Sequence, residues 1–258
     1  MKEHIFVLSD LHLGAPHEQV GIISILEDWD RLADVGIDPV EMAIAKIAMY
    51  VQEQLVSYNK EFALGLQLED VHIVFPGDIF DIDNVYKKYL EKLRKIQSRF
   101  IIVAPSYNWI VIIGNHGCMF IGKGYAIIDG VVVYHGTGVR VRIGEVLGNY
   151  MPLDYDELKT IDWENREGGL SGWRGWRYSL YKLRHWRSGK DKWGKVKDAD
   201  KQIAVLKVLS ENDGVKYTKA IKGHDHRKKC WKGGEYSLWG VPQGSSLYDI
   251  KHDKMYWL

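Results

Sequence analysis

Cysteine is scarce in this chain, with only Cys118 and Cys230 among 258 residues. Two cysteines far apart in sequence exclude a disulfide scaffold, so we expect free thiols in a reducing compartment such as the cytoplasm. Proline is also rare, with six residues, and no collagen-like repeat or low-complexity tract occurs. No apolar run approaches the roughly 18–20 residues that cross a bilayer, and the opening MKEHIFVLSD lacks the features of a signal peptide.

An excess of either charge is absent as well. The net charge is +1, and the chain is 46% hydrophobic and 27% charged, which is ordinary for a globular protein and excludes wholesale disorder. A chain of 258 residues can bury a full core without disulfides or metal staples. We predict a single domain over residues 1–258 with a cap inserted at about 145–200.

The expected insertion differs in composition from its flanks. An acidic stretch runs from Glu145 to Glu164, and from Arg166 to Lys201 there are eleven lysines and arginines against four acids. Five tryptophans lie in the same region, and the spacing from Trp173 to Trp186 predicts a helix with one apolar stripe. The candidate substrate-binding residues on the rest of this helix are Arg174, Arg177, Arg184 and Arg187. The alternatives are a merely solvated basic face, a contact with an anionic membrane, and stacking on single-stranded nucleic acid.

The coarse pattern is one of short apolar runs separated by helical stretches. Strands are predicted at His4–Leu8, Val71–Phe75, Trp109–Ile113, Tyr125–Ile128, Val131–Tyr134, Tyr217–Ile221, Tyr236–Val241, Ser246–Ile250 and Lys254–Leu258. Helices are predicted at Pro39–Ser57, Asn84–Ser98 and Lys201–Leu209. Asp129-Gly130 predicts a two-residue hairpin turn. Early alternation and late hairpins predict layers of helix and mixed sheet.

Polar side chains stand where five of the predicted strands end. The five motifs are Asp10-Leu11-His12, Gly77-Asp78-Ile79-Phe80-Asp81, Gly114-Asn115-His116, His135-Gly136 and Gly223-His224-Asp225-His226. Because sites form at the carboxyl ends of strands, these groups are expected around one point. Asp10 and His12 are two residues apart, so on extended chain they share a face, and His224 and His226 do likewise. Imidazole and carboxylate donors suit Zn, Fe, Mn or Ni, and the glycines allow close approach of the backbone.

In this order, the motifs resemble the calcineurin-like metallophosphoesterase superfamily, and they span residues 10–226. The resemblance implies a four-layered α/β/β/α sandwich with the helical basic insertion as a cap. It implies two divalent metal ions, with manganese as the first choice and iron, zinc or nickel as alternatives. The first ion would be held by Asp10, His12, Asp78 and His226, and the second by Asp78, Asn115, His135 and His224.

The resemblance also implies the catalytic roles. His116 would stabilise the transition state or protonate the leaving oxygen, and Asp81 would orient His116; capping of a helix is the alternative for Asp81. A metal-bridging hydroxide would attack phosphorus in line. One departure is Gly117, where the family usually has an acid.

One branch of the superfamily is closer, the UDP-2,3-diacylglucosamine pyrophosphohydrolases. The segments SDLHLG and GDIFD and the basic insertion resemble that branch. Its members typically carry arginine where this chain has His116 and an acid where it has Thr137, so the likeness concerns architecture.

The sequence therefore predicts a dinuclear phosphoesterase that cleaves a phosphodiester or a pyrophosphate. The alternatives are a nuclease and, in another class, a non-catalytic binding module on the same fold. The run Arg227-Lys228-Lys229 after the last motif favours a multiply charged or polymeric phosphate. His17, close behind Asp10-Leu11-His12, is a further candidate for a substrate contact.

Overall fold

The structure is a computed structural model that describes residues 2–82, 84–112, 114, 125–135, 141–143, 146–148, 195–223 and 226–258. Within these residues the strands form two five-stranded mixed sheets and one two-stranded sheet. The first sheet has the order β12 (Lys254–Tyr256), β11 (Gly244–Asp249), β1 (His4–Ser9), β2 (Val71–Pro76), β3 (Trp109–Ile112). The second has the order β4 (Tyr125–Ile128), β5 (Val131–Tyr134), β8 (Lys219–Lys222), β10 (Tyr236–Gly240), β9 (Lys229–Gly233). The small sheet pairs β6 (Val141–Ile143) with β7 (Val146–Gly148).

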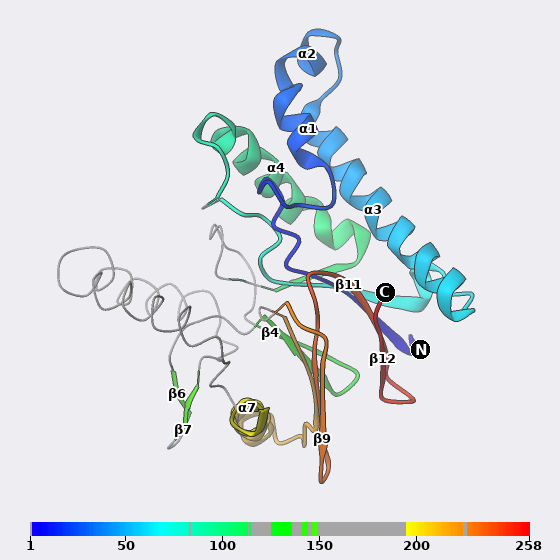
Figure 1. Cartoon of the computed structure of the whole chain (residues 1–258), viewed down its shortest axis with the longest axis vertical. Coiled ribbons are helices and arrows are strands. Elements are labelled where there is room, and N and C mark those ends of the chain that lie inside the picture. Colours follow the sequence, from blue (N-terminus) through cyan, green and yellow to red (C-terminus); the bar gives the residue numbers. More distant parts are fainter. Residues whose placement is uncertain are drawn as a thin grey trace, which may run out of the picture.

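The two large sheets pack face to face, and helices cover their outer faces. Ile5 and Val7 of β1 lie in one buried cluster with Val133 of β5 and Ile221 of β8. The other face of the first sheet packs against α3 (Pro39–Phe62) and α4 (Leu90–Val103), and α1 (Ile22–Glu27) and α2 (Trp29–Asp34) contact α3 (Figure 1). The helix α7 (Lys195–Asp213) covers the second sheet, with Leu206 in the buried cluster. The described elements thus have the predicted layer order α/β/β/α.

The longest described helix, α3, shows how local sequence sets a boundary. The Asp38 carboxylate accepts a hydrogen bond from the Val40 amide at 2.8 Å, and Pro39 occupies the first turn. Apolar residues then recur every three to four positions, so one face is buried against the first sheet. The helix ends where Ala63 adopts a left-handed backbone with φ 54°, five residues later than the sequence predicts.

The prediction for the next helix is wrong at its start. The sequence favours a helix from Asn84, but α4 begins at Leu90, after a short 3-10 turn over Lys87–Tyr89. The reason is that the Asp81 carboxylate binds both the backbone amide and the side chain of Asn84, which holds this segment as a turn. Other short 3-10 turns are Leu68–Asp70 and Ala104–Tyr107.

The hairpin prediction at Asp129-Gly130 is confirmed. The strands β4 and β5 pair antiparallel around these two residues, whose φ angles are 47° and 80°, as the primed turns of hairpins require. The sequence missed α1 and α2, which have six residues each, and the edge strand β9. The predicted cap lies outside the described residues, except for the backbone of β7 and the start of α7.

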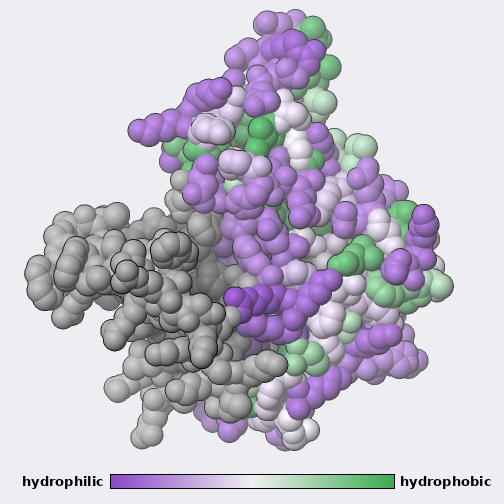
Figure 2. Space-filling model, viewed as in Figure 1, coloured by the Kyte–Doolittle hydropathy of each residue, from purple (hydrophilic) through white to green (hydrophobic). Residues whose placement is uncertain are grey.

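The surface of the described part is mostly hydrophilic. Figure 2 shows hydrophobic residues on this face only in scattered places among hydrophilic ones, which is normal for a protein surface. Among the helices that the structure describes, none is both long and apolar enough to cross a bilayer.

Asp253 ties the two sheets together at the end away from the motifs. Its Oδ1 accepts hydrogen bonds from Ser237 Oγ at 2.8 Å and Trp239 Nε1 at 3.1 Å, both on β10. The same oxygen accepts one from Tyr248 OH on β11 at 2.6 Å, and Lys232 Nζ lies 2.6 Å from Oδ2. One carboxylate therefore satisfies donors from both sheets.

We expect Asp253→Ala to lower the free energy of unfolding at pH 7 by about 3 kcal/mol, because three largely buried donors lose their acceptor. Burial raises the pKa of Asp253, but its hydrogen-bond donors lower it more, so the pKa lies below the usual range. The charge therefore stabilises the protein fully above the unfolded pKa of about 3.9, and this contribution is lost as pH falls through the folded pKa. Urea titrations should show the gap between wild type and variant narrowing below about pH 4. A gap that stays constant in acid would contradict this role of the charge.

Candidate metal centre

Two loops that follow neighbouring parallel strands are joined backbone to backbone. The first follows β1 and the second follows β2. The amide of His12 donates to the carbonyl of Asp78 at 3.0 Å, and the amide of Leu13 donates to the carbonyl of Ile79 at 2.7 Å. The amide of Asp81 donates a hydrogen bond to the carbonyl of Leu13 at 3.0 Å. These bonds fix the two motifs relative to each other.

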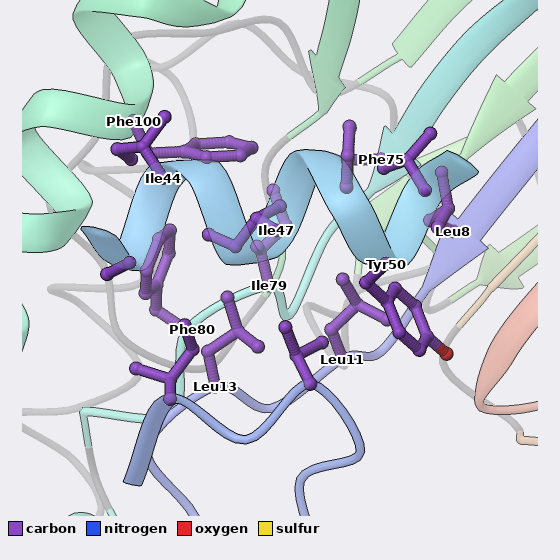
Figure 3. Packing of buried hydrophobic residues seen from close by; sticks show 14 of the residues in the cluster. Leu8, Leu11, Leu13, Ile44, Ile47, Tyr50, Phe75, Ile79, Phe80 and Phe100 are labelled. Carbon is purple, nitrogen blue, oxygen red and sulfur yellow. The ribbon is translucent and has the colours of Figure 1, made fainter. Parts of the chain in front are cut away.

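Apolar residues alternate with the polar ones in both loops and anchor them. Four apolar side chains of the loops lie in the buried cluster beneath α3: Leu11, Leu13, Ile79 and Phe80 (Figure 3). Asp10, His12 and Asp78 instead contact polar residues, namely Ser9, Asp81, His135 and His226. The D-L-H-L and G-D-I-F-D patterns thus combine an anchor with a polar site.

The backbone at the site is left-handed, which corrects one expectation. The sequence predicts that Asp10 and His12 share a face on extended chain, but β1 ends at Ser9 and their φ angles are 54° and 47°. Asp78 and His226 have φ 44° and 50°. These four residues are half of the eight non-glycine residues with positive φ in the described part of the chain. Such backbone costs about 1 kcal/mol per residue and concentrates at functional sites.

Glycine is required where strand ends approach one another. A Cβ on Gly114 would lie 2.2 Å from both the backbone nitrogen and Oδ1 of Asp78. A Cβ on Gly223 would lie 2.6 Å from Ser9 Oγ. The expected close approach at these glycines is therefore present: Gly114 lies against the loop after β2, and Gly223 brings the end of β8 in the second sheet against the end of β1 in the first.

One group of donor atoms comprises Asp10, His12 and His226. His226 Nε2 lies 3.1 Å from Asp10 Oδ1 and 3.4 Å from His12 Nε2. Asp10 is fully buried and also accepts a hydrogen bond from Ser9 Oγ. Ser9 was not predicted from the sequence, although it stands directly before the motif.

A second group comprises Asp10, Asp78 and His135. His135 is fully buried, and its Nδ1 lies 2.8 Å from the carbonyl oxygen of Pro76. A carbonyl can only accept, so Nδ1 carries a proton and Nε2 is the nitrogen left to coordinate an ion. Nε2 lies 3.0 Å from Asp78 Oδ2. Asp10 belongs to both groups, so the two could hold neighbouring ions.

The spacing of the donor atoms fits metal coordination. Bonds of about 2.1 Å at angles of about 90–109° place neighbouring ligand atoms about 3.0–3.4 Å apart. The pairs His135–Asp78, His226–Asp10 and His12–His226 are separated by 3.0, 3.1 and 3.4 Å. The mixture of imidazole and carboxylate suits Zn, Fe, Mn or Ni, and the identity of a metal does not follow from it.

The carboxylates make the site strongly attractive to positive charge. Burial raises the pKa of Asp10, but the hydrogen bond from His226, the charge of His135 and the bond from Ser9 lower it more, so the net shift is downward. The hydrogen bond to Asp10 raises the pKa of His226. Burial lowers the pKa of His135, but Asp78 and Asp10 raise it more, so the net shift is upward. The field that favours protons on these rings also favours a divalent cation.

Asp81 braces His12 in the structure. His12 Nδ1 lies 3.1 Å from Asp81 Oδ2, and Asn84 Nδ2 lies 2.9 and 2.8 Å from the two carboxylate oxygens. The carboxylate fixes the tautomer of His12 and leaves its Nε2 facing His226. The expected partner, His116, lies outside the described residues, so the pairing of Asp81 with His116 stays a prediction.

We expect Asp81→Ala to weaken ion binding at the His12 side about 10–100-fold, because a ligating imidazole that loses its carboxylate brace loses orientation and basicity. Titration with Mn²⁺, followed by calorimetry, would measure this change. Asn84→Ala is the matched control, since it removes two bonds to Asp81 but leaves the bond to His12. Unchanged affinity in Asp81→Ala would exclude this bracing role.

Several predicted site residues lie outside the described residues. They are Asn115, His116, His224 and Asp225, and the insert residues Arg174, Arg177, Arg184 and Arg187. The described parts place Asp10, His12, Asp78, His135 and His226 together. Cys230 is an exposed free thiol.

Comparisons with known proteins add little beyond this geometry. No family model and no curated protein matches the chain. The chain is similar to the structure of a single mutant of Vps29 from Entamoeba histolytica, with 12% identity, coverage of 96% of this chain and 86% of that one, and a TM-score of 0.31. It is also similar to a mutant cold-active protein tyrosine phosphatase, with 11% identity, coverage of 99% and 77%, and a TM-score of 0.37. At these TM-scores neither likeness bears on activity.

Proposed function

We propose that this protein is a dinuclear metal-dependent phosphoesterase of the calcineurin-like type, cleaving a phosphodiester or a pyrophosphate. The observation that carries the proposal is the pair of His/Asp groups sharing Asp10, with donor atoms at coordination distance. They lie where the ends of two parallel strand pairs meet, β1–β2 and β5–β8.

Each residue of the site has a proposed role in holding an ion or in orienting a ligand. Asp10, His12, Asp78 and His226 would hold one ion, and Asp78 and His135 would hold the other together with Asn115 and His224. Bound ions would polarise phosphoryl oxygens and lower the pKa of water. His135 is kept in the ligating tautomer by the Pro76 carbonyl, and His12 by Asp81.

The basic residues are proposed to gather anionic substrate. The four insert arginines supply local positive charge, and Arg227 is exposed beside His226. Lys228 is not part of this role, because its Nζ donates to the carbonyl of Leu258 at 2.5 Å. This distribution favours a substrate with more than one phosphate.

Metal analysis combined with hydrolysis of a chromogenic bis-ester tests the proposal. We expect two ions per chain, hydrolysis that a chelator abolishes, and recovery on adding Mn²⁺. Two bound ions without hydrolysis of any phosphate ester would indicate a binding module instead. A panel containing a nucleoside diphosphate ester and single-stranded DNA would separate a pyrophosphatase from a nuclease.

His116→Ala should keep both ions but slow the reaction by about 10²–10⁴-fold, because general acid catalysis contributes that much. The loss should shrink for esters whose leaving groups are strongly acidic, since these need little protonation. Rates across a series of leaving groups, with ion content measured in parallel, would show this. If the variant lost one ion per chain, His116 would be a ligand and not the acid.

A further inference from the structure

His17 lies next to His12 of the metal centre, on a turn that backbone hydrogen bonds hold in place. The amide of Glu18 donates to the carbonyl of Ala15 at 3.0 Å, which closes a turn with Pro16 and His17 at its centre. Proline presets the backbone angle that this turn position needs. The amide of Ala15 donates to the carbonyl of His12 at 3.0 Å, so the turn is tied to the ligand residue itself.

The ends of this turn are held as well. A Cβ on Gly14, whose φ is 89°, would lie 2.6 Å from Leu93 Cδ2, so the chain here is pressed against α4. On the other side, Glu18 Oε1 accepts a hydrogen bond from the Ile23 amide at 2.9 Å. His17 is therefore presented by fixed backbone.

Three imidazoles lie side by side, with the buried ring of His12 next to both exposed residues, His226 and His17. The ring of His12 lies 5.3 Å from that of His226 and 5.3 Å from that of His17, measured between centroids. His12 is 4% exposed, whereas His17 is an exposed residue. One ring nitrogen of His17 lies within 4.8 Å of donor atoms of both His12 and Asp81.

This cluster does not suit a third ion. A carboxylate has about four lone-pair positions. Asp81 uses them for the amide of Asn84, for contacts of both oxygens with Asn84 Nδ2, and for His12 Nδ1. A cation at Asp81 would have to displace these partners. In the described part of the chain, His17 contacts the ring of His12, and its ring nitrogens are not occupied in the way that the Asp81 oxygens are.

We propose that His17 binds the phosphate group that lies next to the reacting one, and so selects substrates with adjacent phosphates. This inference rests on the proposed function. His17 lies beside His12 and Asp81, whereas the proposed ion ligand His226 faces the Nε2 atom of His12, so the group that His17 meets is not the one under attack. An imidazole N–H can donate to a phosphate oxygen, and such charge-assisted bonds are stronger than neutral ones.

The test uses methylenediphosphonate, a pyrophosphate analogue that cannot be hydrolysed at its bridge, and inorganic phosphate. Both are assayed as inhibitors of bis-ester hydrolysis by the Mn²⁺-loaded full chain with excess Mn²⁺, and binding is measured by calorimetry. We expect His17→Ala to weaken the diphosphonate about tenfold, the value of one charged hydrogen bond. Inorganic phosphate should change less than about twofold, and ion content should stay the same. His17→Gln, which keeps a donor, should recover part of the loss.

His72→Ala is the matched control, because His72 is a histidine whose Nε2 lies 3.2 Å from Asp129, in the loop between β4 and β5. It should change neither inhibitor. Unchanged diphosphonate affinity in His17→Ala, or an equal loss for both inhibitors, would overturn the proposal. A loss of bound ion would overturn it too, by making His17 a ligand or a support of His12. Failure of the proposed function would show in the wild type, as absence of bound ions or of bis-ester hydrolysis.

Discussion

Asp78→Ala is expected to abolish ion binding and activity together. Asp78 is 3% exposed, and its Oδ2 lies 3.0 Å from Nε2 of His135. A carboxylate has two oxygens, so it can bind two ions at once. Without it we expect ion content to fall from two per chain to nearly none. The rate should fall by about 10³-fold or more, because metal polarisation of a phosphoryl oxygen supplies several kcal/mol.

Thermal unfolding gives a readout that does not depend on activity. A ligand that binds only the folded state raises its stability, so Mn²⁺ should raise the melting temperature of the wild type and leave that of Asp78→Ala unchanged. Asp249→Ala is the matched control. Asp249 is also a buried aspartate, 6% exposed, but it pairs with His4 at the opposite end of the sheet. An Asp78→Ala protein that binds two ions with wild-type affinity would refute the assignment.

The same experiment on Asp10 would separate two ways of sharing the ions. The resemblance to known phosphoesterases gives the bridging position to Asp78, whereas the described donor atoms place Asp10 in both groups. If Asp78 bridges, Asp10→Ala should lose the ion at His12 and His226 and keep the one at His135. If Asp10 bridges the two ions, Asp10→Ala should lose both of them.

The position of the site along the chain could be predicted, because it depends on where strands end. An apolar run followed by Asp10 or Asp78 marks both the end of a strand and the start of a polar edge. The alternation of Leu11 and Leu13 with polar residues indicates which side chains pack in the apolar core. Such signals are local, and they concern residues that the core orients directly.

The way each side chain is held could not be predicted. The partner of Asp81 in the structure is His12, 69 positions earlier, and this pairing depends on the backbone bonds between two loops. The left-handed backbone at Asp10 and His226 leaves no pattern in the sequence either, because aspartate and histidine tolerate that region without requiring it. The six-residue helices α1 and α2 are too short to show periodicity.

Gly77→Ala is expected to have the second largest effect, because this glycine meets two demands at once. Its φ is 81°, and a Cβ would lie 2.4 Å from His135 Cγ and 2.6 Å from Nδ1. The left-handed backbone alone costs an alanine about 1 kcal/mol. The added carbon must also displace a fully buried ring, so we expect about 3 kcal/mol or more in total.

Gly36→Ala isolates the steric part of this effect. Gly36 has φ 79°, and nothing lies within 4 Å of its Cβ position. The Gly36→Ala variant should therefore be destabilised only by backbone strain, and it should keep both ions. In Gly77→Ala the displaced His135 loses its bond to the Pro76 carbonyl, so the ion that it shares with Asp78 should be lost as well. Equal losses of stability in the two variants, with ion content unchanged in both, would mean that the contact between Gly77 and His135 does not position the ligand.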